Sequence, residues 1–375
     1  MKIQRTLQIA LILCFCAMLA LPLACADFVG GRVSNTENRM LARFPDPQDG
    51  TMQFYKGIEP WINDNIGFRD AASQLMTRLD YELFRRSAKS TNLIGKEDWI
   101  YYYTDAILQD FIGGNAYSQE VMQSFTTHMQ ELKELLAQRG CETLFVLVPD
   151  KKSVYPENYP AGIHRVVQPS RMNALADALY EQGVEVLNLQ PVLEKAKPQG
   201  FVYSQRLDDA HWNNLGAFVG YRAICERLQP LGARPGTDWT ITPYEATGLF
   251  NMAVPLTEVN YSINCNASSA VVDASSELDM ISDLQYNGDA ATYRRRYRNT
   301  DESLPKLLFI GDSYMQSSYS FYPVSFSEVT YLHYSDAPHF LRVVDEFAPD
   351  IVIFESAERM LDYWLDTLAG CAKEQ

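Results

Sequence analysis

Hydrophobic residues alternate between two patterns along most of the chain. Apolar runs too short for helices, such as TLFVLV at 143–148, predict buried strands, and amphipathic stretches with a helical period separate them. Helices are expected at 118–139, 170–182, 214–228, 337–347 and 357–368, and strands at 143–148, 184–187, 307–310, 329–332 and 351–354. This alternation predicts an α/β fold: a mostly parallel sheet with helices on both faces, in three α/β/α layers. Ligands of open sheets bind beyond the carboxyl ends of the strands.

Two stretches interrupt this pattern. Residues 27–100 are polar and in part helical (52–84), which predicts an N-terminal extension before a main domain at 101–375. Within that domain, 232–304 is rich in proline, serine and aspartate, which predicts an insertion of short strands and loops. Its arginine run, 294–296, is interpreted as a solvated edge strand, with contact to an anionic polymer as the alternative.

The amino terminus carries a targeting signal. Lys2 and Arg5 precede an uncharged apolar run at 9–26, which predicts a signal peptide or a membrane anchor. The small residues at 24–26 favour cleavage before Asp27, and a retained anchor is the alternative. In both cases the remaining chain is expected outside the cytoplasm, in the cell envelope or secreted.

Composition narrows the class of protein. The chain is 47% hydrophobic and 21% charged, which predicts a folded globular protein, and its net charge of −15 argues against nucleic acid as a partner. Beyond the leader lie four cysteines, which allow one or two disulfides or free thiols and lack the spacing of a zinc site (Cys141, Cys225, Cys265 and Cys371). Neither a metal nor a cofactor is expected.

A serine follows one of the expected strands directly. Ser313 lies in the sequence Gly311-Asp312-Ser313 after the strand at 307–310. A serine on a tight turn between a strand and a helix has the placement of an activated nucleophile. An ordinary turn with helix-capping residues is the alternative interpretation.

A histidine beside two aspartates strengthens the first interpretation. His211 lies in a loop before the helix at 214, and neutral imidazole suits the role of base for a serine. Such a base needs a carboxylate on Nδ1, for which Asp209 is the first candidate and Asp208 the reserve. His333 and His339 lie in the loop and helix start after a strand, where lining the same pocket is the minor alternative to a structural role. Further residues follow strands and are either pocket or packing residues (Lys151, Tyr155, Glu355 and Arg359).

These motifs resemble a known family. The chain is similar to the SGNH-hydrolase-like O-acetyltransferases typified by AlgX and AlgJ and to their DHHW relatives. The matching segments are SNTENR to FP at 34–45, NDNIGFR at 63–69, GKEDWIY at 95–101, VPDKKSVYP at 148–156, the Asp-x-His-Trp-Asn block within 207–218, and GDSY at 311–314. Their order puts the serine block last, a circular permutation relative to ordinary SGNH hydrolases. The segment at 232–304 matches the family least.

The resemblance implies both a fold and a function. It implies a flavodoxin-like SGNH sheet, a Ser313–His211–Asp209 triad, and acetyl transfer onto hydroxyls of a cell-surface or secreted polysaccharide. The acetyl donor would be supplied by a membrane-bound O-acyltransferase. The Tyr314 N–H is the expected oxyanion donor, with the Asn213 side chain as a weaker candidate. A carbohydrate acetylesterase and a non-catalytic glycan-binding assembly subunit remain alternatives.

Overall fold

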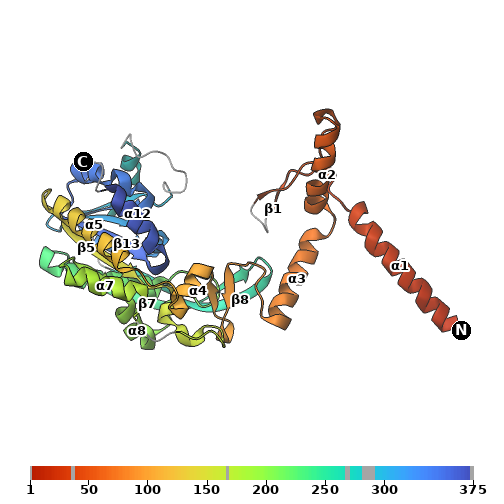
Figure 1. The fold of residues 1–375 in the computed structure, drawn as a ribbon, viewed down its shortest axis with the longest axis horizontal. Helices are drawn as coiled ribbons and strands as arrows, with labels where there is room; N and C mark the ends of the chain where they lie inside the picture. The colour runs from red at the N-terminus through yellow and green to blue at the C-terminus, as the bar shows by residue number, and fades with distance from the viewer. Residues whose placement is uncertain (1, 35–38, 166–168, 267–270, 281–291, 372–375) are drawn as a thin grey trace. The chain divides into compact units, whose positions relative to one another are not determined.

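The chain forms two compact units. The structure is a computed structural model that describes residues 2–34, 39–165, 169–266, 271–280 and 292–371 (Figure 1). The smaller unit comprises Met1–Lys89 and Leu249–Pro255, and the larger one comprises Ser90–Gly248 and Leu256–Gln375. The chain therefore passes from the larger unit into the smaller one and back.

The smaller unit is mainly helical. Its elements are α1 (Lys2–Ala24), β1 (Val33–Ser34), β2 (Arg39–Met40), α2 (Thr51–Asn65) and α3 (Arg69–Phe84). Within α1, Arg5–Ala24 is long and apolar enough to cross a membrane, a test that a signal sequence also passes. Tyr81 of α3 packs against Phe250, with ring centroids 5.7 Å apart, which joins the segment 249–255 to this unit.

The larger unit is built on a mostly parallel sheet. Its strand order is β6 (Val186–Asn188), β5 (Glu142–Val148), β13 (Ile351–Ala357), β11 (Lys306–Gly311), β12 (Glu328–His333), β10 (Arg295–Asn299) and β9 (Val271–Asp273). Neighbours from β6 to β12 are parallel, whereas β10 and β9 are antiparallel. A separate hairpin pairs β3 (Asn92–Ile94) with β4 (Ile100–Tyr102).

Helices cover both faces of this sheet, as the alternation predicts. The helices are α4 (Asp105–Ile112), α5 (Gln119–Ala137), α6 (Lys151–Val154), α7 (Arg171–Glu181), α8 (Gln190–Ala196), α9 (Asn214–Leu228), α11 (Phe340–Phe347) and α12 (Leu361–Cys371). Alternate residues of β5 enter different cores: Val146 packs with α8 and α9, and Phe145 packs with α5, α7, α11 and α12. The α/β/α architecture inferred from the sequence is confirmed.

The segment at 232–304 holds longer strands than expected. β7 (Trp239–Phe250) and β8 (Val254–Cys265) form a two-stranded sheet of their own, with 12 residues in each strand. Most of β7 is exposed, so it lacks the apolar alternation by which a half-buried strand is recognised. The same segment also supplies β9 and β10, which extend the main sheet.

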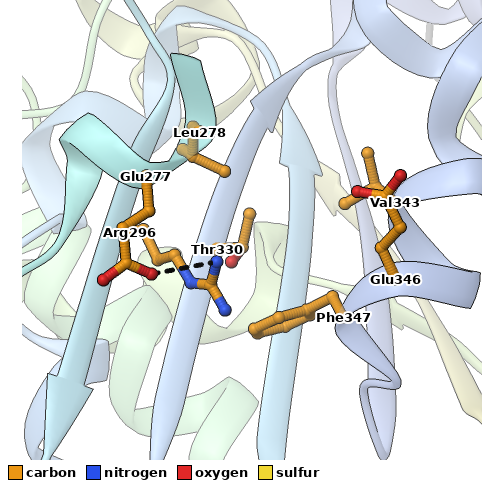
Figure 2. Close-up of a pocket in the computed structure, with 7 residues that line it drawn as sticks. All are labelled: Glu277, Leu278, Arg296, Thr330, Val343, Glu346 and Phe347. Atoms are coloured by element: carbon orange, nitrogen blue, oxygen red, sulfur yellow. Dashed lines mark ion pairs between the residues drawn. The ribbon is translucent and has the colours of Figure 1, made fainter. Parts of the chain in front are cut away.

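The arginine run lies largely in β10, and its first and third side chains, Arg294 and Arg296, are ion-paired, whereas Arg295 lies over the Tyr319 ring. Arg294 contacts Asp336 at 2.7 Å, and Arg296 contacts Glu328 at 2.5 Å and Glu277 at 3.5 Å. Arg296 borders a hollow of about 290 Å³ between β10, β12 and α11, whose floor includes Thr330 (Figure 2). Carboxylates of the same unit pair with the Arg294 and Arg296 guanidinium groups, which argues against contact with an anionic polymer. The expected edge strand is wrong, however, because β10 pairs with β12 on one side and with β9, the strand at the edge, on the other.

The cysteines that the structure describes are free thiols. Beyond the leader these are Cys141, Cys225 and Cys265. The side chain of Cys371 lies outside the described part of the chain.

Candidate active site

Ser313 lies where β11 turns into a short 3-10 helix, η7 (Ser313–Ser318). Asp312 shapes this turn: its Oδ1 accepts the Tyr314 N–H at 3.0 Å and its Oδ2 accepts the Ala357 N–H at 2.8 Å. Gly311 permits a close approach, because a Cβ there would lie 3.1 Å from the Phe309 ring. The turn therefore presents Ser313 at the carboxyl end of the central strand.

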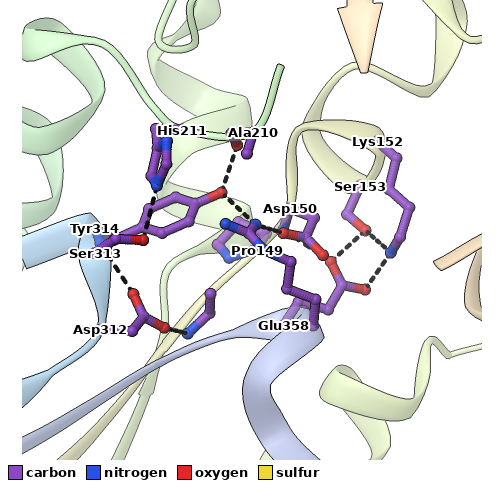
Figure 3. A network of polar contacts seen from close by, with 12 residues as sticks. Pro149, Asp150, Lys152, Ser153, Ala210, His211, Asp312, Ser313, Tyr314 and Glu358 are labelled. Carbon is purple, nitrogen blue, oxygen red and sulfur yellow. Dashed lines mark hydrogen bonds and ion pairs between the residues drawn. The ribbon is translucent and has the colours of Figure 1, made fainter. Parts of the chain in front are cut away.

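His211 meets this serine from a distant part of the chain. Its Nε2 lies 2.8 Å from Ser313 Oγ, although the two residues are 102 positions apart (Figure 3). His211 belongs to the loop that precedes α9. The structure thus brings the serine and the histidine suggested by the sequence into hydrogen-bond contact.

Asp208, and not Asp209, holds the other side of the imidazole. The carboxylate of Asp208 lies 3.0 and 3.1 Å from His211 Nδ1, and its Oδ1 accepts the Ala210 and His211 N–H groups at 2.8 Å each. Such a turn folds an aspartate side chain back over the residues that follow it. The turn makes Asp208, three residues before His211, the partner of the imidazole, so the expected pairing of His211 with Asp209 is wrong.

Asp209 faces a different neighbour. Its carboxylate accepts a short hydrogen bond from Asn92 Nδ2, and its carbonyl accepts the Tyr102 N–H at 2.7 Å. Both partners belong to the β3–β4 hairpin. Asp209 therefore attaches the His211 loop to that hairpin.

The surroundings of Asp208 favour its ionised form. Burial by itself would raise the pKa of this carboxyl, but the His211 imidazole and the two backbone N–H groups lower the pKa below its ordinary value. An ionised carboxylate at Nδ1 keeps Nε2 as the acceptor for the Ser313 proton.

Neither expected oxyanion donor is available for that role. The Tyr314 N–H is engaged by Asp312, as described above. Asn213 is buried, its Nδ2 donates to the Phe201 carbonyl at 2.6 Å, and its Oδ1 accepts the Gly216 N–H at 3.0 Å. Asn213 is thus the N-cap of α9, and both assignments are corrected.

The side chain of Tyr314 joins the two halves of the site. Its hydroxyl donates to the Ala210 carbonyl at 2.6 Å (Figure 3). The hydroxyl also accepts from Arg359 Nη1 at 3.1 Å, and the Tyr314 carbonyl accepts from Trp212 Nε1 at 3.0 Å. Arg359 also forms an ion pair with Asp150. Tyr314 therefore ties the turn that carries Ser313 to both neighbours of His211.

Lys151 contacts the loop that carries His211. It is buried, and its Nζ donates to the Ile100 carbonyl at 2.7 Å and to the Asp208 carbonyl at 2.5 Å. Burial lowers the pKa of Lys151 to about 8, although Asp208, Asp209 and Glu258 favour the charged form. The contact with Asp208 depends on two loops meeting, so the sequence could indicate only that Lys151 follows a strand.

Glu355 and Tyr155 lie in the interior. Glu355 is fully buried beside Gly311, and neither of its carboxyl oxygens has a hydrogen-bond partner. Burial raises its pKa well above the ordinary value, with the Asp312 charge as a second cause. Tyr155 is buried, and its hydroxyl accepts the Val202 N–H at 3.0 Å.

Ser313 and His211 open into a cleft of about 700 Å³. Its walls come from the β4–α4 segment, the residues after β12, and the residues around Arg359. His333 lines this cleft, which was the minor alternative for it, whereas the side chain of His339 lies outside the described part of the chain. Among the described residues, no group of three or more His, Cys, Asp or Glu side chains is arranged to hold a metal ion.

Comparison with curated proteins finds relatives over part of the chain. The probable alginate O-acetylase AlgJ of Azotobacter vinelandii is 26% identical over 182 residues, which is 48% of this chain and 44% of that protein. AlgJ of Pseudomonas syringae pv. tomato is 26% identical over 187 residues and also covered to 44%. The chain thus spans less than half the length of the curated relatives it matches.

Solved structures show the same fold. The O-acetyltransferase domain of Pseudomonas putida AlgJ superposes with a TM-score of 0.50 at 15% identity, covering 76% of this chain and 99% of that one. Bacillus cereus PatB1 superposes with a TM-score of 0.51 at 19% identity, covering 72% and 97%. The sequence model of the SGNH hydrolase-like domain of the acetyltransferase AlgX matches residues 93–324. Since that match covers more than half of the chain, the protein belongs to the AlgX family of SGNH hydrolase-like acetyltransferase domains.

Proposed function

We propose that this protein is an O-acetyltransferase that modifies hydroxyls of a polysaccharide outside the cytoplasm. The observation that carries the proposal is the line of hydrogen bonds from Asp208 through His211 to Ser313, in a chain of this family. The apolar helix α1 supports export or anchoring. The family resemblance further suggests a membrane-bound O-acyltransferase as the source of acetyl groups.

The first half-reaction acetylates the enzyme. His211 Nε2 takes the Ser313 proton while Ser313 Oγ attacks the acetyl carbonyl of the donor. The tetrahedral intermediate collapses, the donor's leaving oxygen receives the proton from His211, and an acetyl ester remains on Ser313. Asp208 stabilises the imidazolium that exists between these steps.

The second half-reaction transfers the acetyl group. His211 takes a proton from a sugar hydroxyl, the sugar oxygen attacks the acetyl ester, and Ser313 leaves with the proton returned by His211. For the oxyanion of both intermediates we propose the Ser313 N–H, because the first amide of a helix has no carbonyl partner within that helix. Water in place of the sugar would give ester hydrolysis.

The test uses a chromogenic acetyl ester with and without an acceptor glycan, followed by mass spectrometry of protein and sugar. Wild-type protein should carry one acetyl group on Ser313 and pass it to the glycan. Ser313→Ala should lose at least about 10³-fold in rate, whereas Ser320→Ala, an exposed serine of the same segment, should behave as wild type. Acetylation that persists in a folded Ser313→Ala variant would contradict the proposal, and hydrolysis without transfer would identify an esterase.

A further inference from the structure

A continuous row of aromatic rings lines one wall of the cleft. The rings of Tyr293 and His333 are stacked with centroids 4.6 Å apart, His333 and Tyr334 follow at 4.2 Å, and Tyr334 and Tyr363 at 5.9 Å. All four residues line the cavity that contains Ser313. They come from three separate segments of the sequence, and we call the four residues the aromatic wall.

Strand register places this wall beside the nucleophile. His333, the last residue of β12, pairs with Gly311 of β11, two residues before Ser313. Tyr334 follows His333 directly, and Tyr363 reaches the cleft from α12. A ligand lying along the wall would therefore pass within the same cavity as Ser313 Oγ.

The charges of the cleft are unusual for a site that binds an anionic polymer. Among the described residues, its lysine and arginine side chains are Arg171 and Arg359, and both already contact carboxylates. Arg171 contacts Asp110 at 3.2 Å and Asp362 at 2.9 Å, and Arg359 pairs with Asp150.

Acidic groups outnumber these cations. Asp110, Asp209, Asp312 and Asp362 all line the cleft. Asp209 accepts its side-chain hydrogen bond from a neutral amide, and the cation that interacts with its charge, Lys151, is buried and is not part of the cleft lining. The local charge is therefore negative, in line with the net charge of −15 for the whole chain.

We propose that the aromatic wall is the acceptor subsite and that it binds an uncharged sugar chain rather than a polyuronate. The inference rests on the proposed function and adds the class of acceptor. The C–H face of a neutral pyranose ring is apolar and packs on an aromatic face, while its hydroxyls bond to the polar groups opposite. A uronate unit would bring a carboxylate to a cleft whose cations are already paired, and like charges held together oppose binding.

The acceptor test compares two sugars that differ only in charge. A short oligomannuronate and its carboxyl-reduced counterpart share linkage and length, and each is offered with the chromogenic acetyl ester as donor. We expect transfer kcat/KM at least about tenfold higher for the reduced, neutral chain. Equal or better transfer to the uronate overturns the inference, and so does transfer to neither sugar.

A second experiment tests the wall itself. Tyr363 is 60% exposed, so replacing it should not disturb folding. Tyr363→Ala should raise the acceptor KM severalfold with a smaller change in kcat, and Tyr363→Phe, which keeps the ring, should restore it. Tyr180→Ala removes another exposed tyrosine (74%), one that is not part of the cleft lining, and serves as the control. An unchanged acceptor KM in Tyr363→Ala contradicts the assignment of the wall.

A charge-changing variant gives a complementary result. Tyr363→Arg should improve transfer to the oligomannuronate relative to the neutral chain, because it adds a cation to the cleft. If the ratio of transfer to the oligomannuronate over transfer to the neutral chain stays unchanged, the electrostatic part of the inference is contradicted. Acetylation of Ser313 by the chromogenic ester, measured without any acceptor, reports separately on the proposed function, so the two can fail independently.

Discussion

The Tyr314 hydroxyl donates a 2.6 Å hydrogen bond to the carbonyl of Ala210, so the residue after Ser313 holds the residue before His211. The Trp212 indole N–H returns a 3.0 Å bond to the Tyr314 carbonyl. Two side chains thus fix the spacing between serine and histidine from both sides. Tyr314 is a positioning residue in this arrangement, because its hydroxyl bonds to Ala210 and Arg359 and to neither Ser313 nor His211.

Tyr314→Phe should weaken the site without removing any reacting group. It leaves the Ala210 carbonyl without its donor, which is expected to cost about 1–3 kcal/mol of stability, and it should lower kcat about ten- to a hundredfold through misplacement of His211. Thermal unfolding and ester kinetics measure both effects. Tyr331→Phe is the matched control, since Tyr331 is also buried but its hydroxyl makes only a 3.5 Å contact. Equal kinetics in the two variants would refute the positioning role.

The two aspartates of the His211 loop should differ in their effects. Asp208→Asn should lower kcat about 10²-fold or more, because an amide at Nδ1 no longer stabilises the imidazolium or its tautomer. Asp209→Asn should cost at least about tenfold less, since Asp209 contacts Asn92 and not the imidazole. Steady-state kinetics on the chromogenic ester compare these isosteric changes. A larger loss in Asp209→Asn would restore the original assignment of the acid.

Lys151 offers a prediction in pH. Its pKa of about 8 in the folded protein lies below the ordinary value, so the unfolded chain binds the proton more tightly between pH 8 and roughly 10. The free energy of unfolding therefore increases as pH rises through that interval, because Lys151 loses its proton more readily in the folded state. Below pH 8 this contribution is absent. We expect the melting temperature of wild type to rise relative to that of Lys151→Met between pH 8 and 10. A constant difference across this range would contradict the assignment.

Glu355 should act in the opposite sense. Because burial raises its pKa, the folded state holds this proton more tightly than the unfolded state does. Its contribution to stability is fully present below the pKa of the unfolded chain, about 4.3. This contribution is lost as pH rises toward the pKa of Glu355 in the folded state. Glu355→Gln should therefore become increasingly more stable than wild type as pH rises from about 4 to 7.

Denaturant unfolding at several pH values measures this difference. Glu142→Gln replaces an exposed glutamate of β5 and should follow wild type throughout. If Glu355→Gln instead became less stable than wild type as pH rises, the ionised carboxylate would be needed for stability, which contradicts the prediction.

Local sequence determined most of the secondary structure of the larger unit. The helix expected at 214–228 is α9 with the same bounds, and Ser118 and Ser170 cap α5 and α7 where the helical patterns begin. Periodicity and capping act over a few residues, so the sequence carries them directly. The long β7–β8 hairpin was not expected, because an exposed strand carries no apolar alternation.

The sequence also singled out Ser313 and His211, but their contact and their partners were decided by tertiary structure. The sequence alone does not distinguish Asp208 from Asp209. The fold of the turn directs Asp208 to His211 Nδ1, whereas Asp209 accepts a hydrogen bond from Asn92. The engagement of the Tyr314 N–H by Asp312 likewise depends on the geometry of one turn. The aromatic wall needs β11–β12 register and the approach of α12, because its rings come from segments that meet only when the sheet is assembled.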